Sequence, residues 1–168
     1  MVKNVIWTSV FILVAGILQS TLLSKLWMSF YATPDIALVI LVYCAYINGS
    51  MTGQLSGFFS GLILDALSFA PLGLNMFTRT ITGALIGVIS GKFFLDIFFL
   101  PLMLCAGATL LKAFLLFLLH FLFAGAVPSY SFTSPVLWVE LLFNSVAAIP
   151  IFAFLKLFDP LLRQKKEV

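Results

Sequence analysis

Long apolar runs broken by short polar segments follow one another along the whole chain. A helix that crosses a lipid bilayer needs about 20 mainly apolar residues. On that rule we expect spans near residues 5–23, 35–48, 52–69, 74–91, 97–124 and 136–158. The pattern therefore predicts an all-α polytopic bundle of six transmembrane helices, forming a single integral membrane domain over residues 1–168.

In the third and fourth expected spans, glycines recur every four positions, and a charged residue continues each series at one end. The two series are Gly53, Gly57, Gly61 and Asp65, and Arg79, Gly83, Gly87 and Gly91. A spacing of four places each series on one helical face, and glycines there let two helices approach closely in a membrane. We expect an antiparallel hairpin in which the glycines mainly pack these two helices together. The order of residues would bring Asp65 and Arg79 to the same membrane face, where we predict an ion pair.

Other polar residues also fall inside the apolar runs, where charges are costly and often functional. A rise of 1.5 Å per residue gives their depths. The groups expected in the outer half are Asp35, Asp65, Arg79, His120 and Glu140, with Lys112 deeper and Asn144 one turn below Glu140. His120 and Glu140 match in depth, which predicts a second pair. No acid matches the depth of Lys112, which favours a polar pocket or groove around it. The alternative is that Lys112 extends toward the interface or bonds Asn144 and backbone carbonyls.

Two interpretations of this polar cluster stay open. The groups either fix the register of the helices, or line an outward-opening pocket or groove that receives a ligand or another protein's helix. A catalytic role is disfavoured, because the chain has a single histidine, no nucleophile motif and no paired metal ligands such as H-E-x-x-H. We expect no enzyme activity, no cofactor and no metal.

Composition agrees with the membrane interpretation. Hydrophobic residues make up 62% of the chain and charged residues 9%, more apolar surface than a soluble domain of 168 residues could bury. At this length we expect one compact bundle with no room for a soluble catalytic domain. Cys44 and Cys105 lie in apolar runs and are expected to be small core residues. The first apolar run exceeds a usual signal-peptide core in length and lacks an A-x-A site, so we expect a retained span.

The cations predict the orientation of the bundle. With six spans, one side of the membrane holds Lys3, Lys92, Lys156, Arg163, Lys165 and Lys166, and the other side holds only Lys25. Cytoplasmic loops carry the excess of Lys and Arg. Both termini are therefore expected in the cytoplasm.

Residues 34–73 resemble the MreD family of bacterial rod-shape-determining membrane proteins. The matching residues are Pro34-Asp35 opening an apolar helix, Gly57-Phe58, Gly61-Leu62, Asp65 and Pro71-Leu72-Gly73, with GFFSGLILDALSFAPLG as the most similar stretch. Asn144 followed by Pro150 is also similar to the last helix of that family.

The resemblance implies a non-enzymatic, multi-pass protein of the bacterial cytoplasmic membrane that maintains cell shape within the cell-wall elongation complex (the elongasome). It implies binding to the bitopic protein MreC and, indirectly, to MreB filaments and the RodA–PBP2 peptidoglycan synthase. Independently of the resemblance, we expect contact with membrane lipids and no nucleic-acid partner, because most of the cations lie at membrane boundaries. It also implies a fold similar to the substrate-binding subunits of energy-coupling-factor transporters.

A substrate-capture subunit of a vitamin transporter is the alternative function. Subunits of that kind are expected to carry an Ala-x-x-x-Ala surface on the first helix. The first span here offers only Ala15-Gly16, which disfavours the alternative.

Overall fold

The computed structural model describes residues 2–19, 32–68, 71–91, 98–123, 127 and 132–163. Every regular element in these ranges is a helix, as the sequence predicts. The helices are α1 (Val2–Leu18), α3 (Ile36–Asn48), α4 (Ser50–Leu67), α5 (Leu74–Val88), α6 (Phe99–Leu122), α7 (Pro135–Lys156) and α8 (Asp159–Leu162). Among the described residues, α6 and α7 are the two helices long and apolar enough to cross a membrane.

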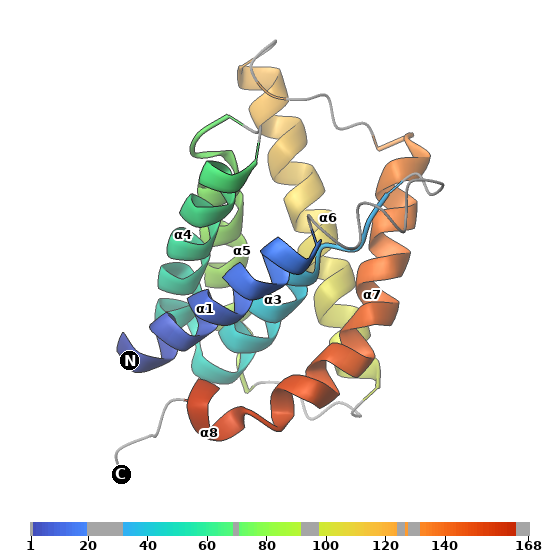
Figure 1. Cartoon of the computed structure of the whole chain (residues 1–168). Helices are drawn as coiled ribbons and strands as arrows, with labels where there is room; N and C mark the ends of the chain where they lie inside the picture. Colours follow the sequence, from blue (N-terminus) through green and yellow to red (C-terminus); the bar gives the residue numbers. More distant parts are fainter. Residues whose placement is uncertain are drawn as a thin grey trace.

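The shortest of the long helices, α3, lies at the centre of the bundle. It packs against α1, α4, α5, α6 and α7, and residues 37–45 are all buried. Figure 1 shows α1 crossing α3, with α4 and α5 on one side and α6 and α7 on the other. The 13 residues of α3 rise only about 20 Å, less than the ~30 Å of a bilayer's hydrocarbon core. The terminal backbone groups of such a helix need polar partners within the protein.

Side chains and a carbonyl from three helices surround the C-terminal end of α3. Asn48 Nδ2 donates to the carbonyls of Cys44 (3.0 Å) and Leu162 (2.8 Å). The amide of Asn4 donates to the same Leu162 carbonyl at 3.0 Å. These bonds hold the beginning of α1 beside α8, so the two described ends of the chain lie at one end of the bundle (Figure 1).

The glycine series on α4 and α5 lies where the two helices meet. A Cβ atom on Gly53 would stand 2.2 Å from the Gly83 carbonyl oxygen, and one on Gly57 would stand 2.3 Å from the Arg79 carbonyl oxygen. Further along the interface, Gly61 faces the backbone of Met76, and at the opposite end Gly87 faces Ser50. The contacts run in opposite directions along the two helices, which are therefore antiparallel and touch backbone to backbone.

Gly91 does not belong to this interface, and its expected packing role is wrong. A Cβ atom there would meet nothing within 4 Å. Helix α5 ends at Val88, where the N–H groups of Ile89 and Ser90 bond the carbonyls three residues before them. This tighter turn carries the chain away from the glycine face, and Gly91 adopts a left-handed conformation with φ of 69°.

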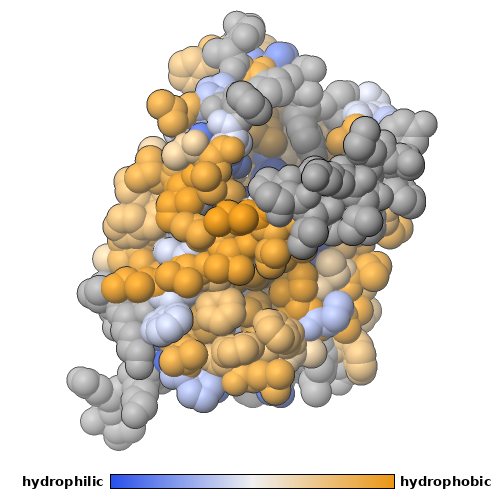
Figure 2. Space-filling view, viewed as in Figure 1, coloured by the Kyte–Doolittle hydropathy of each residue, from blue (hydrophilic) through white to orange (hydrophobic). Residues whose placement is uncertain are grey.

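The outside of the bundle is rich in apolar side chains. Large exposed hydrophobic residues include Val14 on α1, Leu62 on α4, Phe121 on α6 and Trp138 on α7. Figure 2 shows a broad, continuous hydrophobic area on the face that contains α1 and α4. Apolar patches of this kind are typical of surfaces that contact lipid or another protein.

Candidate functional site

Asp35 lies at the centre of a buried network of charges that joins four helices. It caps α3 by accepting the N–H of Leu38 at 3.0 Å. Both of its oxygens accept from Nη2 of Arg79 on α5, at 2.7 and 3.0 Å. Lys112 on α6 donates to Oδ2 of Asp35 at 2.9 Å and to Oε1 of Glu140 on α7 at 2.7 Å. The order Arg79–Asp35–Lys112–Glu140 alternates positive and negative charge, so the four groups balance.

A second set of hydrogen bonds fixes the backbone of Asp35. Its N–H donates to Oδ1 of Asn144 on α7 at 2.6 Å. The amide of Asn144 donates in turn to Thr109 on α6 at 3.0 Å, and Asn144 is fully buried. The Thr109 hydroxyl donates to the Cys105 carbonyl. The N-terminal end of α3 is therefore held by α6 and α7 through its backbone as well as its side chain.

Three of the four charged side chains are buried, so the stability of the protein depends on their pairing. Arg79 is 5% exposed, and Asp35 and Glu140 are each 6% exposed. A buried ion that loses its partner is strongly destabilising, whereas a paired and hydrogen-bonded ion is tolerated. The network can therefore hold α3, α5, α6 and α7 in a single arrangement.

The predicted Asp65–Arg79 ion pair is wrong, because Arg79 bonds Asp35 instead. Asp65 accepts four hydrogen bonds from the beginning of α5: from the backbone N–H groups of Gly73, Asn75 and Met76 and from the Asn75 side chain, all at 2.9–3.0 Å. These N–H groups have no partner within the helix, and the helix dipole favours a negative charge beside them. Arg79 lies one helical turn after Asn75 on α5, and from that position its side chain reaches Asp35.

The predicted His120–Glu140 pair is also replaced. His120 Nδ1 lies 2.8 Å from the carbonyl oxygen of Val127, while Glu140 accepts from Lys112. The expectation that no acid matches Lys112 is wrong, because the depth of a Cα atom ignores the length of the lysine side chain. The depth of Asp35 predicts its place in the cluster but not its partners, because the two cations that bond it lie 44 and 77 residues away in sequence.

Replacing Asp65 with alanine should lower the free energy of unfolding by about 1–2 kcal/mol, since the first turn of α5 loses its acceptor. Asn75→Ala is the control, because it removes one of the four hydrogen bonds and leaves the Asp65 carboxylate in place. Its loss of stability should be smaller. Thermal unfolding in detergent measures both. A larger loss in Asn75→Ala than in Asp65→Ala would contradict this role.

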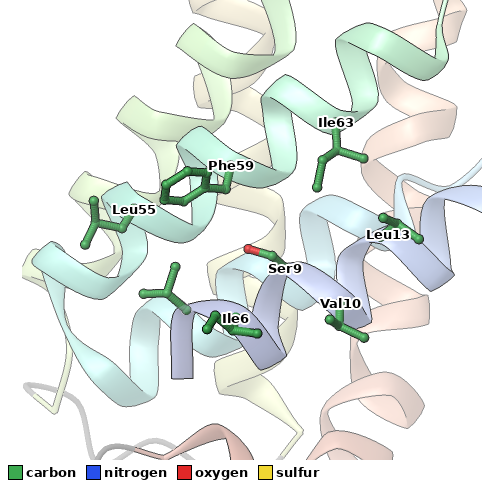
Figure 3. A pocket seen from close by; sticks show the side chains of 8 residues that line it. Ile6, Ser9, Val10, Leu13, Leu55, Phe59 and Ile63 are labelled. Carbon is green, nitrogen blue, oxygen red and sulfur yellow. The ribbon is translucent and has the colours of Figure 1, made fainter. Parts of the chain in front are cut away.

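An apolar groove lies between α1 and α4, apart from the charge network. It encloses about 510 Å³ and is lined by Val5, Ile6, Ser9, Val10, Leu13, Leu55, Phe59 and Ile63. In Figure 3 Leu55, Phe59 and Ile63 lie along α4, and the Ser9 hydroxyl of α1 points toward that helix. That hydroxyl is buried and has no hydrogen-bond partner. The groove thus offers an apolar surface with one unused polar group.

Metal binding finds no support in the part of the chain that the structure describes, where no group of three or more His, Cys, Asp or Glu residues could hold an ion. Cys44 and Cys105 are both buried and unpaired.

An apolar exterior around a central helix held by buried charges is typical of a helical membrane protein. The chain belongs to the MreD family: it matches the family model of the rod shape-determining protein MreD over residues 1–158. No curated protein and no solved structure matches the chain. The family is one of membrane proteins that determine rod shape and is not a known enzyme family.

Proposed function

We propose that this chain is a non-enzymatic subunit of the bacterial cell-wall elongation complex that binds the transmembrane helix of an MreC-like bitopic protein. Through that partner it helps to organise peptidoglycan synthesis by the RodA–PBP2 synthase along MreB filaments. Membership of the MreD family is the observation that carries this proposal.

The proposal includes six spans in the cytoplasmic membrane with both termini in the cytoplasm. The bond between Asn4 and the Leu162 carbonyl supports it, because an even number of crossings returns the chain to the side where it began. Arg163, which directly follows α8, is a cation at that end. Lys25, Lys92, Lys165 and Lys166, on which the orientation also depends, lie outside the described residues.

The groove between α1 and α4 is the surface proposed for the partner's helix. Its walls contain residues spaced by four, Ile6 and Val10 on α1 and Leu55, Phe59 and Ile63 on α4. Helices associate in lipid through close packing and through hydrogen bonds between polar side chains. A partner helix in the groove would bury these apolar rows and place an acceptor or donor near the Ser9 hydroxyl.

Filling the groove should therefore remove the partner. Val10→Trp places a large ring between α1 and α4, where we expect co-purification of the MreC-like protein from native membranes to fall by about tenfold or more. The matched control is Val146→Trp on α7, which starts from a similarly exposed valine outside the groove. Thermal unfolding of the purified variants checks that both remain folded. Full recovery of the partner with Val10→Trp, together with its loss with Val146→Trp, would contradict the groove as the binding surface and indicate an interface on α7.

A further inference from the structure

A second, more polar pocket lies beside the charge network, at the end of the bundle where α3 and α5 begin. It encloses about 280 Å³ between the end of α1, the end of α4 and the beginnings of α3 and α5. Its polar lining includes Asp35, Asn75 and Arg79, and Leu64 and Leu67 form an apolar wall. The pocket is distinct from the apolar groove and shares no residue with it.

Arg79 has hydrogen-bond donors that the protein does not use. Its Nη2 atom bonds Asp35, but Nε and Nη1 are buried and have no acceptor. A guanidinium group carries five N–H donors, and buried donors in proteins are almost always satisfied. A buried arginine that lines a cavity and keeps unused donors indicates that an acceptor enters the cavity from outside the chain.

The chemistry of that acceptor follows from the surrounding charges. Asp35 already accepts from Arg79, Lys112 and the N–H of Leu38, and Lys112 also bonds Glu140, so the four charges of the network balance. Asp65, near the same end of the bundle, is saturated by four donors from α5. The unused groups on Arg79 are donors only, and guanidinium bonds the oxygens of carboxylates and phosphates most strongly.

The apolar wall adds a second requirement. Leu67 is exposed at the end of α4, and Leu64 packs against Gly16 of α1. These side chains offer hydrocarbon surface next to the arginine. We infer that the pocket binds an amphiphilic anion, with a carboxylate or phosphate oxygen bonded to Arg79 and an aliphatic portion against Leu64 and Leu67.

The test uses the full chain in dodecyl maltoside, a detergent without an anionic group. Phosphatidylglycerol is the lipid probe, and hexyl phosphate and hexanoate are the water-soluble probes. Diacylglycerol and hexanol are the uncharged controls. At least one anionic probe should raise the thermal midpoint in a saturable manner, and its uncharged counterpart should not. Stabilisation by phosphatidylglycerol alone would identify a lipid headgroup as the source, and stabilisation by the soluble probes alone would identify a soluble amphiphile.

Two variants locate the site. Arg79→Lys keeps the positive charge but removes the extra donors, and Leu67→Trp fills the pocket from an exposed position without touching the ion pair. Each should weaken binding of the active probe by about tenfold. Val146→Ala, at an exposed position on α7 outside both pockets, should bind as the unmodified chain does.

Equal stabilisation by charged and uncharged probes, or no stabilisation by any, would overturn the inference. So would unchanged affinity in Leu67→Trp, which remains informative if Arg79→Lys fails to fold.

Discussion

Replacing Asp35 with leucine is expected to destabilise the protein by about 3 kcal/mol or more. The substitution leaves Arg79 without its anion and Lys112 with Glu140 as its remaining carboxylate in the network. It also removes the side-chain cap from the first turn of α3. Unfolding by heat or by sodium dodecyl sulfate, followed by circular dichroism, measures the loss.

A double-mutant cycle separates this network from a general effect of removing a charge. Asp35→Leu and Arg79→Leu together should cost less than the sum of the single changes, because the double variant strands neither partner of that pair. The same cycle on Asp65 and Arg79 is the control and should be nearly additive, since their side chains bond different groups. Stronger coupling in the control than in the Asp35–Arg79 cycle would contradict the network described above.

Gly53→Leu is the second substitution with a large expected effect. A side chain there would collide with the Gly83 carbonyl at 2.2 Å and with the Cβ of Ala45 at 2.9 Å, and neither neighbour is a flexible side-chain end. The two helices would have to separate, and packing is the main attraction between helices in lipid. We expect a loss of about 3 kcal/mol or more, at the upper end of overpacking effects.

Gly107→Leu is the matched control for that substitution. Gly107 lies on α6, and a Cβ atom there meets nothing within 4 Å. The same chemical change should therefore leave the thermal midpoint almost unchanged. A fully stable Gly53→Leu protein would show that α4 and α5 do not touch through their backbones.

The glycine ladder and the ion pairs are connected through one residue. The Arg79 carbonyl lies against Gly57, while the Arg79 guanidinium holds Asp35. Close packing of α4 on α5 therefore helps to set the position from which Arg79 reaches α3. Bulk at Gly57 should disturb both the hairpin and the charge network.

The helix positions could be predicted from the sequence because the length of an apolar run and a spacing of four are local properties. The antiparallel contact of Gly53 with Gly83 follows from the same spacing once the intervening turn is known. The partners of Arg79 and Lys112 are not local, because they depend on how far each side chain extends and on which helix is central. The proline before Asp35 and the shortness of α3 are the signals that point to a buried helix end.

The polar contacts at the other end of α3 were missed for a related reason. Asn4 and Asn48 lie at the boundaries of apolar runs, where polar residues are expected at the membrane surface. In the structure both donate to the carbonyl of Leu162, more than 100 residues further along the chain. The need to satisfy the end of a short central helix becomes visible only after the helices are assembled.

Depletion of the chain in the cell that encodes it tests the proposed function most directly. Cell width and vitamin uptake should be measured in the same culture, with the unmodified chain and Val10→Trp supplied in trans. We predict swollen or rounded cells with unchanged uptake, restored to normal shape by the unmodified chain and not by Val10→Trp. Normal shape accompanied by a vitamin requirement would contradict the account and favour a transporter subunit.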